Sequence, residues 1–201
     1  MSRLPRGFHA RAATVVAPAL LGQVLVRRLP SGEELRARLV ETEAYEQDDP
    51  ASHAFRGITA RNGVMFGPPG RLYVYFTYGM HHCMNVVVGR EGEGCAVLLR
   101  AAEPLEGLAE MGRARGTDRL RDLCRGPARL AQAFAVDRSL DGADLVAGDQ
   151  LWIERGRSVD PMDVRSGPRV GIRVATERPW RFWVDEPWVS SRRWGPVSAR
   201  S

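Results

Sequence analysis

The chain has 201 residues, a length that fits one substantial domain or at most two small ones. Its hydrophobic content of 44% is ordinary for a globular core, and no apolar run is long enough to cross a bilayer. The net charge of +5 is compatible with nucleic-acid binding without proving it. All 29 basic residues are arginines, so no lysine amine is available to form a Schiff base.

The first 23 residues combine an early arginine with a later apolar stretch, as signal peptides do. Pro18 interrupts that stretch and strand-like sequence follows directly, so we expect a mature cytoplasmic protein, at most associated with a bacterial nucleoid. Residues 14–23 predict a short helix that starts near Pro18. Residues 24–29 and 35–45 predict two strands around a turn that contains Gly32.

Residues 46–70 are loop-rich, and structureless stretches of that length are often functional. Residues 71–88 predict a β-hairpin with Gly79 near its tip. Two helical pieces are expected within residues 117–136, the second starting at Pro127, because proline suits the first helical position. Further short strands are predicted at residues 95–104, 149–156, 168–174 and 181–185.

The order of these elements predicts an α+β fold. The strands are mostly connected as hairpins, which favours an antiparallel sheet over a nucleotide-binding βαβ fold. Neither GxGxxG nor GKS or GKT occurs, so the P-loop and Rossmann folds have no support.

The cysteines do not have the spacing of a metal site. Cys83, Cys95 and Cys124 are scattered without a CxxC pair, and we interpret them as reduced core thiols. His81 and His82 precede Cys83 directly, but adjacent residues on a strand point to opposite faces. We therefore expect no metal and no cofactor.

Residues 40–45, VETEAY, bring two carboxylates and a phenol close together. Strict alternation places Glu41, Glu43 and Tyr45 on the same face as the apolar residues of 35–39. A buried ionised carboxylate is unfavourable unless it is paired or used. Either this strand end emerges into water, or it lines a cleft.

The predicted hairpin also carries residues that a core does not require. Tyr73 and Tyr75 share one face, while the apolar residues beside them can bury on the other. Tyr78 lies at the tip, where it either packs on a neighbouring loop or separates stacked bases as a wedge. Asn85 precedes a run of valines, so its amide is either a structural bridge or a reader of a ligand edge.

Seven segments occur in one order from about residue 10 to residue 195: VETEAY, SHAFRG, GPPGRLYVYFTYGMHHCMN, VLLRAAEPLEG, RGPARLAQAF, PRVGI and PWRFWV. Together they resemble the alkylpurine (3-methyladenine) DNA glycosylase family of the alkyladenine type. Each segment alone is a weak signal, whereas the ordered set is highly specific. The loop between Tyr45 and His53 looks shorter than in the family, and His81 and His82 replace residues that are often aromatic.

The resemblance implies a role for each matched residue. Glu43 matches the carboxylate that activates water for attack on the sugar C1′. Arg100 matches an arginine near that water and the phosphate of the target nucleotide. Tyr45 matches the ring that stacks on one face of the flipped base, and His53 and Tyr75 match the pair that contacts its other face.

Three further residues complete this assignment. Tyr78 resembles the residue that enters the minor groove and fills the gap left by the flipped nucleotide. Asn85 matches the amide that clashes with the exocyclic amino group of normal guanine. Glu41 matches no chemical role, and we interpret it as structural. The fold implied is one compact domain over residues 1–201, with a mostly antiparallel, partly barrel-like sheet, flanking helices and a protruding β-hairpin.

The chemistry of base removal explains these residue types. The enzyme must flip the nucleotide at a cost of a few kcal/mol, and aromatic stacking of about 1–3 kcal/mol per base offsets that cost. Alkylated purines such as 3-methyladenine and 7-methylguanine are cationic, so rings attract them and they leave readily. A general base supplying about 10²–10⁴-fold is then sufficient. Neutral lesions such as hypoxanthine or ethenoadenine also need a proton, whose donor the sequence does not identify.

The missing lysine bears on the outcome, because bifunctional glycosylases nick DNA through an imine. We therefore expect a monofunctional enzyme, a monomer that acts on double-stranded DNA containing damaged purines. Arginines are expected to contact phosphates, with solvated surface arginines as the alternative. The candidates are Arg56, Arg61, Arg125, Arg129, Arg192 and Arg193.

Two other functions fit parts of the sequence. A sugar glycosidase could use Glu41 and Glu43, but residues two apart on a strand lie about 7 Å apart, too far for a retaining pair. A non-catalytic nucleic-acid-binding domain could use the tyrosines as a stacking platform. It would bind single strands and release no base.

Overall fold

The computed structural model describes residues 2–77 and 80–190, so Tyr78, Arg192 and Arg193 lie outside the described residues. An antiparallel sheet forms the centre of the fold, with neighbouring strands in the order β3-β4-β5-β2-β1-β6. The strands are β1 (Val24–Arg28), β2 (Glu34–Tyr45), β3 (Leu72–Thr77), β4 (His81–Val87), β5 (Ala96–Glu106), β6 (Leu151–Glu154), β7 (Val164–Gly167) and β8 (Arg181–Val184).

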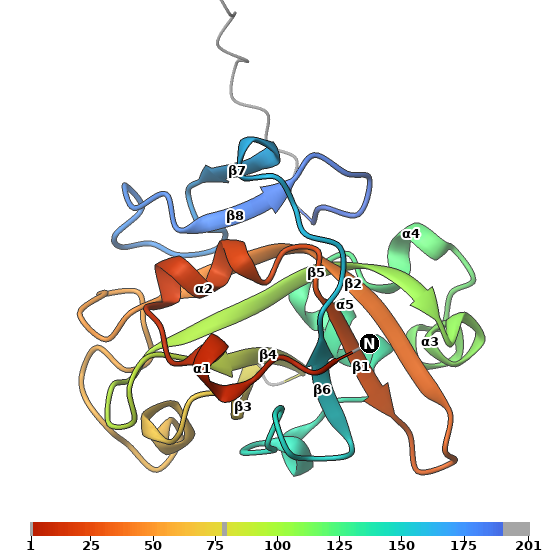
Figure 1. The fold of residues 1–201 in the computed structure, drawn as a ribbon, viewed down its shortest axis with the longest axis horizontal. Helices are drawn as coiled ribbons and strands as arrows, with labels where there is room; N and C mark the ends of the chain where they lie inside the picture. Colours follow the sequence, from red (N-terminus) through yellow and green to blue (C-terminus); the bar gives the residue numbers. More distant parts are fainter. Residues whose placement is uncertain (1, 78–79, 191–201) are drawn as a thin grey trace, which may run out of the picture.

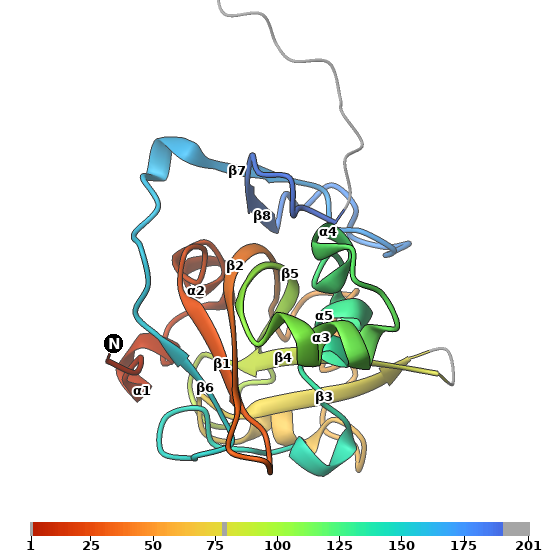
Figure 2. The same ribbon diagram turned by 90° about the vertical axis from the view of Figure 1, so that its right-hand side faces the viewer.

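The sheet curls and branches at β2. Strand β8 pairs with residues 41–43 of β2, beyond the part of β2 that pairs with β1, and with β7, so the β7–β8 pair extends the same sheet as a branch (Figure 1). The helices are α1 (Arg6–His9), α2 (Ala13–Ala19), α3 (Leu108–Arg115), α4 (Leu120–Leu123) and α5 (Pro127–Ala133). The expected α+β class and single antiparallel domain are confirmed. The hairpin of β3 and β4 protrudes from the body (Figure 2).

The main core lies on one face of the curled sheet. Leu39 on β2, Val74 on β3 and Leu99 on β5 are fully buried there, together with Val16 of α2 and Leu130 of α5. Each fully buried aliphatic side chain contributes about 1.5–3 kcal/mol. The two helices therefore close the core side of the sheet and leave its opposite face to other elements.

Three register shifts interrupt the pairing of β2 with β5, and the one at Val40 overturns the expected alternation along β2. Leu39 faces Ala102 and Glu41 faces Ala101, so Val40 has no partner in the register; Arg100 has none either. The pattern therefore shifts by one residue, and Ala44 lies in the same core as Leu39. Glu41, Glu43 and Tyr45 consequently lie on the face opposite the apolar residues of 35–39. The prediction of a shared face was wrong because a bulge adds one unpaired residue.

Three local predictions also need correction. Residues 168–174 form a loop, because the strand of this region is β7, which ends at Gly167, and Gly171 adopts a left-handed φ of 81°. Helix α2 begins at Ala13 and contains Pro18 near its end, so it does not start at the proline. Helix α3 was not predicted. The helices around α4 and α5 are confirmed, the latter starting at Pro127.

Among the described residues, no helix is long and apolar enough to cross a membrane. The three cysteines are free thiols; Cys95 and Cys124 are buried, as expected of core residues, whereas Cys83 is only half-buried.

Candidate active site

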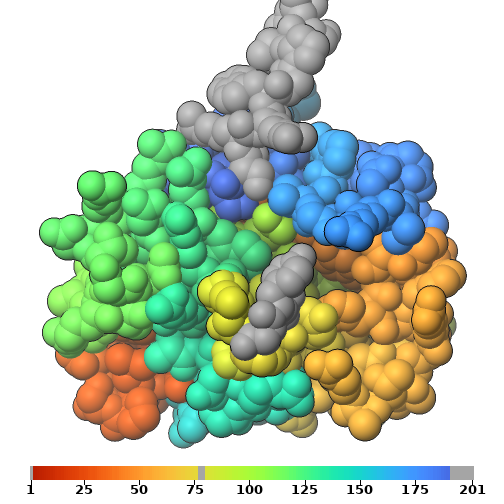
Figure 3. Space-filling view, turned by 180° about the vertical axis from the view of Figure 1, so that it is seen from behind, coloured from red at the N-terminus to blue at the C-terminus, as the bar shows by residue number. Residues whose placement is uncertain are grey.

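A pocket of about 610 Å³ opens on the face of the sheet opposite the main core. It forms where β3, β4, β5 and the end of β2 meet the loops of residues 46–70 and 168–174. Figure 3 shows the hairpin in yellow near the centre, with the orange loop region beside it and the blue β7–β8 region above. Five of the predicted site residues line this one pocket: Tyr45, His53, Tyr75, Asn85 and Arg100.

One wall of the pocket is an aromatic cluster. The ring centroids of His53 and Tyr75 lie 4.0 Å apart at an interplanar angle of 43°. The hydroxyl of Tyr73 lies 3.2 Å from Nδ1 of His53 and ties the imidazole to β3. Burial, with a smaller effect from Arg61, lowers the pKa of His53, so the imidazole is neutral at physiological pH. The wall is therefore an uncharged surface made of tilted aromatic rings.

Asn85 is both a structural bridge and a pocket residue. It lies opposite Tyr73 in the β3–β4 ladder, and its Nδ2 donates to the Tyr73 carbonyl oxygen at 3.3 Å. The same side chain lines the pocket while remaining 8% exposed. The two alternatives that the sequence left open are thus compatible.

Cys83 also lines the pocket, and burial raises the pKa of its thiol to about 11, so it remains protonated.

Glu43 lies behind the pocket wall that Tyr45, Arg100 and Val170 form opposite the aromatic cluster. Its Oε1 accepts a hydrogen bond from the Val170 N–H at 2.8 Å and lies 3.2 Å from Nη1 of Arg100. Its Oε2 accepts from the Tyr45 hydroxyl at 2.8 Å. The Glu43 side chain is fully buried and does not itself line the pocket, although Tyr45, Val170 and Arg100 all do. Two hydrogen bonds and one ion pair therefore hold this carboxylate at the pocket wall.

Two pKa shifts reflect this charge. Burial, and then the negative charge of Glu43, raise the pKa of Tyr45 well above its usual range, so its phenol remains a donor. Burial opposes the charge of Arg100, but Glu43 and Glu41 outweigh it and raise the pKa of this arginine. The unpaired position of Arg100 in β5 aims its guanidinium at both carboxylates.

Glu41 is held entirely within the protein. Its Oε1 accepts from Nε of Arg181 at 2.6 Å and lies 3.3 Å from Nε of Arg100. Its Oε2 accepts from the Ser190 N–H at 2.6 Å. Glu41 does not line the pocket. These contacts support a structural role for Glu41 and give no support to a pair of carboxylates acting on a sugar.

The arginines proposed for phosphate contacts are distributed around the site. Arg56 and Arg61 are exposed on the loop of residues 46–70. Arg125 and Arg129 line a second cleft of about 350 Å³ that also includes Arg100. Arg125 donates to the Val189 carbonyl oxygen at 2.9 Å, and Arg129 pairs with Asp122 at 2.9 Å. Both therefore have partners within the protein.

Sequence reasoning missed part of the pocket. Tyr73 was placed on the correct face without a role. Val170 and its neighbours from Gly171 to Val174 line the pocket, although their segment was expected to be a strand. The segment PRVGI was part of the family resemblance and so indicated that this region matters, but nothing in the sequence shows that the backbone N–H of Val170 binds Glu43. Among the described residues, no cluster of His, Cys, Asp and Glu could hold a metal.

The fold and the site combine an aromatic pocket with a buried carboxylate–arginine pair at its wall. The family described as Methylpurine-DNA glycosylase (MPG) matches residues 7–187, and the chain belongs to this family.

Close relatives support this assignment, and each is named as a proposed 3-methyladenine DNA glycosylase. The Streptomyces avermitilis protein is 55% identical over 197 residues, covering 94% of this chain and 92% of the relative. The Burkholderia lata protein is 51% identical over 201 residues, covering 98% and 93%. The Methanocella arvoryzae protein is 44% identical over 203 residues, covering 98% and 100%.

Proposed function

We propose that this protein is a 3-methyladenine DNA glycosylase that flips alkylated purines out of duplex DNA and hydrolyses their N-glycosidic bonds. The observation that carries the proposal is the position of Glu43, whose two hydrogen-bond donors and paired arginine all line an aromatic pocket. The flipped base lies between Tyr45 and the His53–Tyr75 pair. Its sugar then lies at the wall formed by Arg100 and Val170.

The proposed reaction is a single hydrolysis. A water oxygen attacks C1′, the bond from C1′ to the base nitrogen breaks, and its electron pair leaves with the purine. Glu43 accepts the proton of the water as general base. In the structure the Tyr45 hydroxyl donates to Oε2 of Glu43, and the carboxylate oxygens have further lone pairs that can accept from the water.

Lesion choice follows from the walls of the pocket. Cationic 3-methyladenine and 7-methylguanine gain cation–π attraction from the tyrosine rings, and the neutral His53 does not repel them. Asn85 would crowd the exocyclic amino group of normal guanine. Hypoxanthine and ethenoadenine lack the positive charge, so we expect them to be excised more slowly.

The test uses purified protein and two DNA substrates: methylated genomic DNA, and a duplex oligonucleotide with one ethenoadenine or hypoxanthine. Free bases are measured by chromatography, and alkali reveals abasic sites. Wild type should release 3-methyladenine and 7-methylguanine. Binding of single strands without release of any base would instead indicate a non-catalytic nucleic-acid-binding domain.

We also propose that the enzyme is monofunctional. The chain contains no lysine, so the strand should remain intact until alkali is added. Borohydride added during turnover should trap no covalent protein–DNA adduct. A trapped adduct would contradict this part of the proposal while leaving base release intact. A monomeric enzyme that works in the cytoplasm completes the proposal.

A further inference from the structure

Arg169 of the segment PRVGI is not explained by the proposed reaction. Its side chain is fully buried, and so is that of its partner Asp49. Nη2 of Arg169 donates to Oδ1 of Asp49 at 3.0 Å, and Nη1 donates to Oδ2 of the same carboxylate. Nη1 also donates to the Ala44 carbonyl oxygen at 3.0 Å. One guanidinium therefore joins the loop of residues 46–70, the end of β2 and the loop of residues 168–174.

The same guanidinium belongs to an alternating stack of rings and cations. Its Cζ lies 4.6 Å from the ring centroid of Tyr45 and 5.3 Å from that of Trp180. On Trp180 a second cation follows, with Cζ of Arg178 at 4.6 Å. Tyr45 lines the pocket whereas Arg169 does not, so the arginine covers the rear face of the ring and leaves the front face for a base.

Arg169 also acts on the residue that follows it. Val170 donates its backbone N–H to Oε1 of Glu43 at 2.8 Å. Tyr45, which stacks on Arg169, donates to the other oxygen of Glu43. Arg169 therefore contacts or adjoins both hydrogen-bond donors of Glu43. Moving Arg169 would move the stacking ring and one carboxylate donor together.

We propose that Arg169, locked by Asp49, is a positioning residue that fixes the ring of Tyr45 and the amide of Val170 around Glu43. We further infer that Asp49 cancels the Arg169 charge that a cationic base on the front face of Tyr45 would otherwise meet. Both inferences rest on the proposed glycosylase function. On this proposal, the buried ion pair of Arg169 and Asp49 determines how well a base fits the pocket and whether charged or neutral bases are preferred.

The charge relation gives the inference its distinctive signature. With Asp49 neutral, an uncompensated cation would lie 4.6 Å behind the Tyr45 ring and repel a cationic purine on its front face, which would lower the flipped population and hence the excision rate by about tenfold. A neutral purine would be spared this repulsion. A purely structural ion pair would affect both kinds of base equally.

The experiment measures single-turnover excision of 7-methylguanine and of ethenoadenine by the full-length protein. Asp49→Asn should lower the ratio of 7-methylguanine to ethenoadenine excision by about tenfold. Arg169→Met should slow both bases without lowering that ratio, because it removes the cation. Arg28→Met is the matched control, since Arg28 stacks over Trp152 away from the pocket, and it should leave both rates unchanged.

The double variant Asp49→Asn/Arg169→Met leaves no buried unpaired charge and is the version expected to fold most readily. It should slow both bases alike, with a melting temperature showing that the protein is folded under assay conditions. Wild-type rates in the double variant would overturn the positioning role, and an unchanged ratio in Asp49→Asn would overturn the charge role. Failure of wild type to release either base would instead refute the proposed function.

Discussion

Two regions of the sheet contain nearly the same set of side chains. On β2, the Tyr45 hydroxyl donates to Glu43, and Arg100 pairs with that carboxylate. On β6, Nε1 of Trp152 donates to Glu154 at 2.8 Å, and Arg36 pairs with that carboxylate. In both regions the ring and the carboxylate are two residues apart on one strand.

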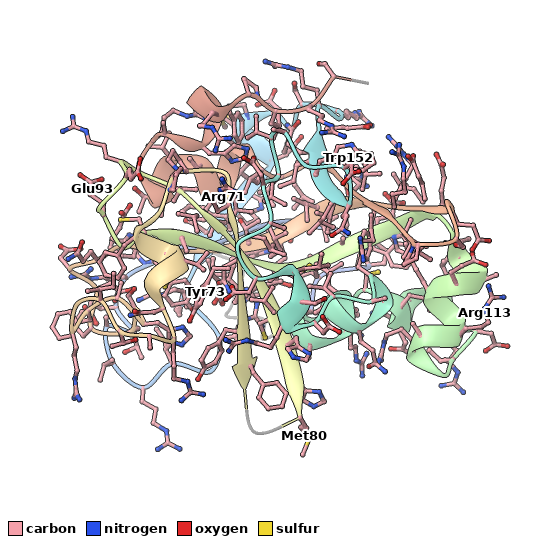
Figure 4. All side chains as sticks on the ribbon, turned by 90° about the horizontal axis from the view of Figure 1, so that it is seen from below. Arg71, Tyr73, Met80, Glu93, Arg113 and Trp152 are labelled. Carbon is pink, nitrogen blue, oxygen red and sulfur yellow. The ribbon has the colours of Figure 1, made fainter. Side chains whose placement is uncertain are left out.

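The difference lies in the faces of the two rings. Two guanidinium groups cover Trp152, with Cζ of Arg3 at 4.4 Å and Cζ of Arg28 at 5.2 Å, and the residue is only 3% exposed. Tyr45 is covered by Arg169 on one face, while the other face lines the pocket. Figure 4 shows Trp152 on β6, well separated from the pocket residue Tyr73 on β3. A buried carboxylate, arginine and ring therefore form a structural cluster unless a ring face is open.

Exchanging each glutamate for glutamine provides the largest test of this comparison. Glu43→Gln should lower the single-turnover rate of base release by about 10²–10⁴-fold, because the amide cannot accept the proton of water. Glu154→Gln should destabilise the protein by about 1–3 kcal/mol through its weakened contacts to Arg36 and Trp152, without changing the rate. Excision assays and urea unfolding measure the two effects. A Glu43→Gln enzyme as fast as wild type would show that the two clusters are alike.

The sequence predicted most of the site through residues that share a face or an ordered motif. Tyr73, Tyr75 and Asn85 needed only strand alternation and a hairpin to meet. His53 lies on a loop 20 residues before Tyr73, and only the resemblance to a family predicted it at the pocket. The contact of the Tyr73 hydroxyl with Nδ1 of His53 was not predicted.

The parts that failed depend on tertiary contacts. The bulge at Val40 reverses which face of the sheet Glu43 occupies, and no pattern in the sequence marks it or the bulge at Arg100. The loop around Arg169 looked like a strand because its residues alternate, but its backbone is shaped by the ion pair to Asp49 and the left-handed Gly171. Such contacts join residues more than a hundred positions apart.

His9 on α1 is a third buried polar group, and unlike both glutamates its ring nitrogens have no partner among the described residues. Burial, helped by Arg6 and Arg11, lowers its pKa from 6.5 to about 4. The unfolded chain therefore binds the proton first, so stability is complete above pH 6.5 and is lost as the pH falls toward 4. The loss should reach about 3 kcal/mol.

Urea unfolding between pH 7 and pH 4 measures this loss, and His9→Leu is the control because it removes the titrating ring. The difference between the two proteins should grow as the pH falls. If the free energies of unfolding of the two proteins changed with pH in parallel, His9 would gain a partner on protonation, and its unpaired ring would not destabilise the folded protein at low pH.

Tyr45 separates stacking from hydrogen bonding within the pocket cluster. Tyr45→Leu should weaken retention of the flipped base by about 1–3 kcal/mol, a loss of about 5- to 150-fold, because the stacking face is gone. Tyr45→Phe keeps the ring and uncovers Oε2 of Glu43, so it should lose much less. Ethenoadenine fluorescence can follow base flipping in both variants. Equal losses would assign the role of Tyr45 to its hydroxyl and not to its open ring face.

The smallest expected effect concerns arginines outside both clusters. If Arg125 contacts a DNA phosphate beside the cleft that it shares with Arg129, Arg125→Gln should reduce the slope of log affinity against log salt by about 0.9. Arg28→Gln is the control and should leave the slope unchanged, because Arg28 stacks over Trp152 in the β6 cluster and lines neither the aromatic pocket nor the cleft of Arg125. Fluorescence anisotropy with a duplex containing ethenoadenine, titrated at several salt concentrations, gives both slopes. Equal slopes for wild type and Arg125→Gln would place the phosphate contacts on other residues. The open face of the Tyr45 ring would then be the remaining structural indication of where DNA binds.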